Sequence, residues 1–236
     1  MKEARPTERV VLSWSGGKDS SLALASLRAD PRYDVVALLT SITSGYDRVS
    51  IHGVRRDLLE AQAVAVALPL VEVVLQAQSS NEAYEAAFLE ALSRVRAAYP
   101  DVGTIAFGDL FLADVRLYRE RLVAAAGFHA IFPLWGRDTQ ALAEEFIAMG
   151  FRAHVVCVDT TQMAPRFAGR EFDASLLADM PDTIDRCGER GEYHTFVWSG
   201  PIFETPLRVR RGENVLREER FMFCDLLRDD PAFRAN

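Results

Sequence analysis

The first half of the chain alternates between short apolar runs and amphipathic segments, and this alternation strongly constrains the fold. The apolar runs are rich in valine and leucine and have the length of buried strands. The segments between them repeat apolar residues at helical spacing. Strands and helices in this order predict an α/β fold, a parallel five-stranded doubly wound sheet with helices on both faces. The expected strands are residues 9–14, 33–43, 69–75, 104–109 and 129–135.

Local signals mark where the expected helices begin and end. Ser79 and Glu82 have the spacing of a capping box, which predicts a helix from about Asn81 to Tyr99. Gly127 is placed to take the left-handed position at the end of the following helix. The expected helices are residues 18–29, 52–68, 81–99 and 113–127.

The second half of the chain is less regular. Residues 138–150 are typical of a helix and residues 152–160 of a strand. Strand-like runs follow over residues 195–223, with an expected turn at residues 211–214, and they indicate an antiparallel element. The sequence therefore predicts two domains: residues 1–130 with the parallel sheet, and a smaller α+β domain over residues 131–236.

Composition narrows the class of protein. The chain of 236 residues is 49% hydrophobic and has a formal net charge of -7. It contains no apolar run of the roughly 20 residues that a membrane helix needs, and its first residues are charged, so a cytoplasmic protein without a membrane partner is expected. The acidic balance argues against a nucleic-acid partner. Three dispersed cysteines without a CxxC pair exclude a zinc ribbon or dithiol motif of sequence neighbours.

The string S-G-G-K-D-S at residues 15–20 stands between the first expected strand and the first helix. It differs from a Walker A loop, which would need glycine at Leu12 and a hydroxyl residue at Asp19. It also lacks the third glycine of a dinucleotide fingerprint. A different phosphate-binding loop is therefore expected.

The residue types of this string suit a polyphosphate. Glycines let the backbone approach a ligand, and the first N–H groups of the helix attract an anion. Serine hydroxyls and a lysine add donors and positive charge. Asp19 is predicted to bind a metal, Mg2+, shared with phosphate, although it could instead cap the helix. The predicted phosphate-binding residues are Ser15, Gly16, Gly17, Lys18, Asp19 and Ser20.

A second unusual string covers residues 187–203. Glu189, Glu192 and His194 place three ionisable groups within six residues, next to glycines. Carboxylate and imidazole side chains suit proton transfer, so these three are the predicted catalytic residues. Thr195 adds a hydroxyl and is predicted to contact substrate. A polar loop that leads into a strand is the alternative interpretation.

Two further residues are predicted to contact substrate. His52 opens the second expected helix, where it could also be a surface cap. Asp109 follows the fourth expected strand and faces the same edge of the sheet, where it could also cap a turn. If the bound polyphosphate is ATP, its adenine is expected beside the end of the second strand, at residues 39–42.

The S-G-G-K-D-S string resembles the pyrophosphatase-loop signature of ATP-dependent adenylating enzymes, such as GMP synthetase, asparagine synthetase and tRNA thiolation enzymes. The resemblance implies an adenine nucleotide alpha-hydrolase-like fold, with ATP and Mg2+ as cofactors. It also implies that ATP is split between its α- and β-phosphates.

The second string resembles the C-terminal signature of the diphthine–ammonia ligase family, GE-x-GE-F/Y-HT-x4-GP-x-F, and the likeness covers about residues 9–205. The matching positions are Gly188, Glu189, Gly191, Glu192, Tyr193, His194, Thr195, Gly200, Pro201 and Phe203. The resemblance implies a ligase that adenylates a small-molecule or protein-borne carboxylate and transfers ammonia to it. The family's named acceptor is diphthine on elongation factor 2. An alanine- and arginine-rich chain without long insertions is similar to the family's bacterial relatives.

Two other functions remain open at this point, an RNA-modifying adenylating enzyme and a nucleotide-binding sensor without catalysis. The missing CxxC and the acidic charge weigh against the first, and the Glu189–His194 cluster weighs against the second. The acceptor, the ammonia source and a homodimeric state are left open by the sequence.

Overall fold

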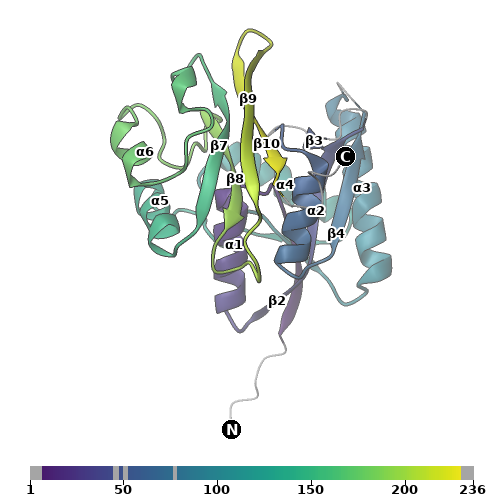
Figure 1. Ribbon diagram of the computed structural model, residues 1–236. Coiled ribbons are helices and arrows are strands. Elements are labelled where there is room, and N and C mark those ends of the chain that lie inside the picture. Colours follow the sequence, from purple (N-terminus) through teal and green to yellow (C-terminus); the bar gives the residue numbers. More distant parts are fainter. Residues whose placement is uncertain (1–6, 45–47, 50–52, 77–78, 230–236) are drawn as a thin grey trace.

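The structure is a computed structural model that describes residues 7–44, 48–49, 53–76 and 79–229. Within these residues the chain forms two sheets, one largely parallel and one antiparallel (Figure 1). No helix of the described part is long and apolar enough to cross a membrane.

The first sheet contains five parallel strands in the spatial order β4-β2-β1-β5-β6, which confirms the predicted doubly wound fold. A short strand, β3, runs antiparallel to the end of β2 and was not predicted. The strand order reverses at β1, between β2 and β5, so a ligand crevice is expected at the carboxyl ends of β1 and β5. The bounds are β1 (Glu8–Ser13), β2 (Tyr33–Thr43), β3 (Arg48–Val49), β4 (Leu70–Leu75), β5 (Thr104–Ala106) and β6 (His129–Ile131).

Helices cover both faces of this sheet. Val10 and Leu12 of β1 point into one core cluster, and Val11 points into the other, as the alternation of a strand requires. Helices α1 (Lys18–Ala29) and α2 (Arg56–Ala65) pack in the first cluster. The second cluster takes α3 (Asn81–Ala98) and α4 (Ala113–Ala125).

One predicted helix end is confirmed, and one predicted helix cap is wrong. Gly127 follows the end of α4 with a φ of 74°, as predicted. The N-cap of α3 is Ser80, whose hydroxyl oxygen accepts a hydrogen bond from the amide of Ala83. The predicted cap, Ser79, instead donates its hydroxyl to the carbonyl of Gln76 and closes the turn before the helix.

The second sheet confirms the smaller α+β unit. Its strands are all antiparallel, in the order β8-β7-β10-β9. β6 ends at Ile131, one residue past the expected domain boundary, and the boundary itself stays a prediction. The elements are α5 (Thr139–Ala148), β7 (Arg152–Asp159), the 3-10 helix η1 (Pro165–Phe167), α6 (Ala174–Asp179), β8 (Tyr193–Ser199), β9 (Val209–Arg217) and β10 (Phe221–Arg228).

The turn expected at residues 211–214 is wrong, because these residues lie inside β9. The hairpin turns instead at Glu218 and Glu219, which have φ values of 51° and 53°. Gly212 lies close against Asp225 of β10, beside a register shift between Cys224 and Leu226. The glycine therefore marks an irregular strand pairing and not a chain reversal.

Candidate active site

The loop between β1 and α1 bends sharply at Gly16. This residue has a φ of 77°, and a Cβ there would lie 2.6 Å from the Oε1 atom of Gln62. Only glycine fits both the conformation and the space. The Gly16 carbonyl accepts hydrogen bonds from the Val197 amide at 2.9 Å and from Gln62 Nε2 at 3.0 Å. Two distant parts of the chain therefore fix the bend.

Gln62 is the centre of a buried polar network under this loop. Its Nε2 also donates to the Val197 carbonyl at 2.5 Å, and its Oε1 accepts from Trp14 Nε1 at 3.0 Å. The side chain is fully buried. Sequence reasoning missed Gln62, although a glutamine on the apolar face of a predicted helix is a signal that could have been used.

Thr195 of β8 caps the start of α1. Its Oγ1 accepts a hydrogen bond from the Lys18 amide at 3.0 Å, and the residue is buried. The N-cap residue of α1, Gly17, has no side chain to do this. The two motifs of the sequence therefore meet directly, although 177 positions separate these residues.

The hydroxyl groups of the loop hold its own backbone. The Gly17 amide donates to Ser15 Oγ at 3.2 Å, and the Gly17 carbonyl accepts from the hydroxyls of Ser20 and Ser21 at 3.0 and 2.9 Å. Ser15 Oγ and Ser20 Oγ lie 3.1 Å apart. Both predicted serines lie in the loop and line the cavity described below.

Lys18 and Asp19 form an ion pair at the start of α1. The Lys18 ammonium is buried and lies 2.7 and 2.9 Å from the two carboxylate oxygens of Asp19. It also donates to the Cys187 carbonyl. Burial acts to lower the pKa of Lys18, but the Asp19 carboxylate and other neighbours outweigh it, so the pKa lies above its ordinary value. Lys18 therefore keeps its positive charge.

The Asp19 side chain remains 29% exposed, so a ligand can reach it. Among the described residues its carboxylate accepts hydrogen bonds from Lys18, and none from a helix amide. This geometry favours the ligand-facing interpretation of Asp19 over the helix cap.

Glu189 brings a proton-transfer group to the same place. Its Oε1 accepts a hydrogen bond from the Leu110 amide, just after β5, at 2.7 Å. Burial raises the pKa of this carboxyl to about 7, and the negative charges of Asp19 and Asp109 act in the same direction. A carboxyl that titrates near neutrality, in a cleft, is a candidate acid or base.

Glu192 has a different position. It is 1% exposed, and its two carboxylate oxygens accept hydrogen bonds from the amides of Asp185 and Arg190, each at 3.0 Å. It does not line the cavity, whereas Glu189 and His194 do. Of the three predicted catalytic residues, Glu189 and His194 thus line one cavity, and Glu192 holds the 185–190 loop that carries Glu189.

The end of β5 completes the site. Gly108 packs against the first turn of α1, where a Cβ would lie 3.1 Å from backbone atoms of Asp19 and Ser20. Asp109 lines the cavity, and its Oδ2 lies 3.8 Å from Nε of Arg119. The remaining predicted substrate residue, His52, lies outside the described residues.

These residues surround a cavity of about 880 Å³ at the carboxyl ends of the parallel strands. Leu39, Thr40 and Ser41 of β2 line it where adenine is expected. Thr40 Oγ1 is buried there and has no hydrogen-bond partner in the part of the chain that the structure describes. No group of three or more His, Cys, Asp or Glu side chains in the described ranges is arranged to hold a metal ion.

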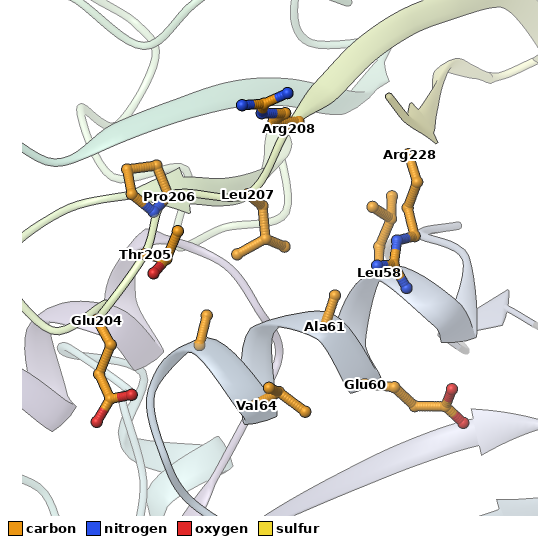
Figure 2. A pocket seen from close by; sticks show the side chains of 11 residues that line it. Leu58, Glu60, Ala61, Val64, Glu204, Thr205, Pro206, Leu207, Arg208 and Arg228 are labelled. Atoms are coloured by element: carbon orange, nitrogen blue, oxygen red, sulfur yellow. The ribbon is translucent and has the colours of Figure 1, made fainter. Parts of the chain in front are cut away.

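A second cavity of about 470 Å³ lies elsewhere, between α2 and residues 204–208 (Figure 2). Ala61 of α2 and Leu207 point toward one another across it (Figure 2). None of the predicted site residues that the structure describes lines this second cavity.

Two known family domains match this chain. Residues 8–130 match the diphthamide synthase N-terminal domain, and residues 138–229 match the diphthamide synthase C-terminal domain. Relatives named diphthine–ammonia ligase include one from Rattus norvegicus, 26% identical, and one from Homo sapiens, 25% identical. Both alignments cover 88% of this chain and 85% of the relative.

A Schizosaccharomyces pombe protein of the same name is 25% identical over 207 residues, which are 80% of this chain. The match covers 34% of the yeast protein, so the chain spans about a third of that relative's length. Both family domains follow one another in this chain, and together they account for most of its length. The chain therefore belongs to the diphthamide synthase family.

Proposed function

We propose that the protein is an ATP-dependent ligase that adenylates a carboxylate and then transfers ammonia to it, releasing AMP and pyrophosphate. The main support is the meeting of two sets of groups in one cavity. Lys18 and Asp19 come from the loop after β1, and Glu189 comes from the distant second motif. The first set suits a polyphosphate and the second suits a proton transfer.

In the first step an oxygen of the acceptor carboxylate attacks the α-phosphorus of ATP. The bond from this phosphorus to the bridging oxygen breaks, and pyrophosphate leaves with the electron pair. The loop at residues 15–20 is proposed to hold the pyrophosphate part, because the buried Lys18 ammonium is a fixed positive charge beside the start of α1. Thr40, with its unpartnered hydroxyl, is proposed to bind the adenosine part.

Mg2+ is proposed to enter with the nucleotide. The ion prefers one or two carboxylates together with phosphate oxygens and water, and Asp19 and Asp109 both line the cavity. Asp19 and Asp109 would hold it, and bound Mg2+ supplies charge stabilisation to the phosphates.

In the second step ammonia attacks the carbonyl carbon of the acyl-adenylate, and AMP leaves. Glu189 is proposed as the base, because a carboxyl with a pKa of about 7 is available both to accept and to release a proton near neutral pH. His194 lines the same part of the cavity and is proposed to act on the acceptor side. Glu192 is assigned a positioning role, since its oxygens are bound by backbone amides.

The relatives' shared name makes diphthine on elongation factor 2 the first acceptor to test. The three cysteines are free and buried, which supports a reducing compartment such as the cytoplasm. A homodimer stays a prediction.

The test incubates the protein with ATP, Mg2+, ammonium and elongation factor 2 that carries diphthine. The expected result is AMP and pyrophosphate in equal amounts with the amide, measured by nucleotide chromatography and by mass spectrometry of the factor. If diphthine is inert, a panel of other carboxylic acids is tested in the same assay. Turnover to ADP and orthophosphate, or no acceptor-dependent pyrophosphate with any carboxylate, contradicts the proposal, and the latter result favours the sensor.

A further inference from the structure

Arg119 is a cavity residue to which the proposed mechanism gives no task. It lies on α4 and lines the large cavity together with Tyr84 of α3 and Phe107 at the end of β5. Its side chain is 25% exposed. A charged group in this setting normally has strong partners, because burial removes its hydration.

The contacts of Arg119 leave most of its hydrogen-bonding capacity unused. Within the described residues, its guanidinium donates one hydrogen bond, to Tyr84 Oη at 3.4 Å. Asp109 Oδ2 lies 3.8 Å from Nε, and Nε is buried with no hydrogen-bond acceptor among the residues that the structure describes. A guanidinium has five N–H donors. The guanidinium is therefore held in place, but most of its N–H groups have no acceptor among the described residues.

The ring of Phe107 helps to hold it. The guanidinium carbon of Arg119 lies 5.1 Å from the ring centroid, within the range of a cation–π contact. Tyr84 of α3 and the stretch after β5, through Phe107 and Asp109, thus restrict the guanidinium from two different segments. A restricted guanidinium loses little entropy when it binds a ligand.

Arg116, on the same helix, shows what a satisfied arginine looks like here. Its Nε donates to Glu120 at 2.7 Å, and its guanidinium lies 4.8 Å from the Trp135 ring centroid. It does not line the cavity. The two arginines therefore form a matched pair: Arg116 has a close carboxylate partner outside the cavity, and Arg119 lines the cavity with only a distant one.

We propose that Arg119 is a binding residue for an oxyanion of the reactants, a carboxylate or a phosphate. The planar fork of arginine binds two oxygens of either group at once. Arg119 reaches the cavity from α4, whereas Lys18 reaches it from α1, and these helices pack on opposite faces of the sheet. The assignment rests on the proposed function, in which the cavity takes both ATP and an acceptor carboxylate.

The experiment compares wild type, Arg119→Gln and the control Arg116→Gln, with Arg119→Lys as a variant that keeps the charge and loses the fork. Calorimetry gives the dissociation constant for ATP with Mg2+. Melting temperatures are then measured with saturating α,β-methylene-ATP and either sodium succinate or sodium phosphate as the anion probe. These readouts need no turnover, so they can fail or succeed independently of the proposed reaction.

A phosphate of ATP is the ligand if Arg119→Gln and Arg119→Lys weaken ATP binding about tenfold or more while Arg116→Gln does not. The acceptor carboxylate is the ligand if ATP affinity is unchanged and the stabilisation by succinate, present in wild type and in Arg116→Gln, is lost in both Arg119 variants. Unchanged ATP affinity together with equal, or equally absent, anion stabilisation in all four proteins overturns the proposal. If Arg119→Gln does not fold, Arg119→Lys alone decides between these outcomes.

Discussion

Thr195 accepts, through its side-chain oxygen, a hydrogen bond from the backbone amide of Lys18 at 3.0 Å. This bond joins β8 of the antiparallel sheet to the start of α1, which follows β1 of the parallel sheet. A second hydrogen bond, from the Val197 amide of β8 to the Gly16 carbonyl, connects the same two parts of the chain. The shape of the loop after β1 therefore depends on the C-terminal part of the chain.

Thr195→Val is expected to destabilise the protein and to weaken ATP binding. Valine has the shape of threonine but leaves the buried Lys18 amide without an acceptor, which costs about 1–3 kcal/mol. Chemical denaturation and ATP calorimetry are the measurements. Thr195→Ser, which keeps a hydroxyl, is the control and should retain most of both properties. Wild-type stability in the valine variant would show that this bond contributes nothing.

Gln62→Leu is expected to be among the more costly single substitutions in this chain. Leucine leaves the Gly16 carbonyl, the Val197 carbonyl and the Trp14 indole N–H with fewer partners, and the expected loss is about 2–5 kcal/mol. The control is Gln140→Leu on the surface of α5, expected within about 0.5 kcal/mol of wild type. Urea denaturation measures both, and equal losses would contradict the role of Gln62.

Gly108→Ala is expected to weaken ATP binding with little loss of the fold. The added Cβ would lie 3.1 Å from backbone atoms of Asp19 and Ser20, so the first turn of α1 must shift. A displacement of this kind in a binding loop can cost on the order of tenfold or more. Gly103→Ala, at the other end of β5, meets no heavy atom within 4 Å and is the matched control. Calorimetry on both variants checks the prediction, which fails if the two bind ATP equally well.

Glu189→Gln is expected to lower the rate of amide formation by about 10²- to 10⁴-fold, the range for a lost general base. In wild type kcat/KM should rise with pH through about 7, as the Glu189 carboxyl loses its proton. The variant should lack this limb of the pH profile and still bind ATP. An unchanged pH profile in the variant would assign the titration to another group.

The raised pKa of Glu189 also predicts how the stability of the protein changes with pH. Because folding raises the pKa of Glu189 from 4.5 to about 7, the folded state binds the proton more tightly than the unfolded state between these values. This tighter proton binding stabilises the folded state. The stabilisation is complete below pH 4.5 and is lost as the pH rises through about 7. Glu189→Gln should therefore melt higher than wild type at about pH 8, with the difference much reduced at about pH 5. Melting curves at the two pH values decide this, and a constant difference would contradict it.

Much of the fold could be predicted, because the physical signal was local. The strands β1, β2 and β4 are continuous apolar runs bounded by breakers, and the structure places them where the sequence does. The errors arose where two local signals compete. Ser79 and Ser80 can both cap a helix, and the Ser79 hydroxyl is bonded to the Gln76 carbonyl instead. Gly212 has the composition of a turn but lies within a strand.

The candidate site was only partly predictable for the same reason. Glu189 and Glu192 each follow a glycine, and nothing local tells which one faces the cavity. The Leu110 amide, which follows β5, donates a hydrogen bond to Glu189. The Asp185 and Arg190 amides donate hydrogen bonds to the two carboxylate oxygens of Glu192. These contacts follow from how the 185–192 loop packs against the sheet, which the sequence does not display.

The path of one oxygen atom tests the central claim most directly. The acceptor carboxylate is labelled with ¹⁸O, turnover is run with ATP, Mg2+ and ammonium, and the phosphorus-containing products are analysed by mass spectrometry. If the carboxylate attacks the α-phosphorus while the loop holds the departing pyrophosphate, one labelled oxygen appears in AMP and none in pyrophosphate. Label in orthophosphate alongside ADP, or unlabelled AMP with full amide formation, would contradict the account.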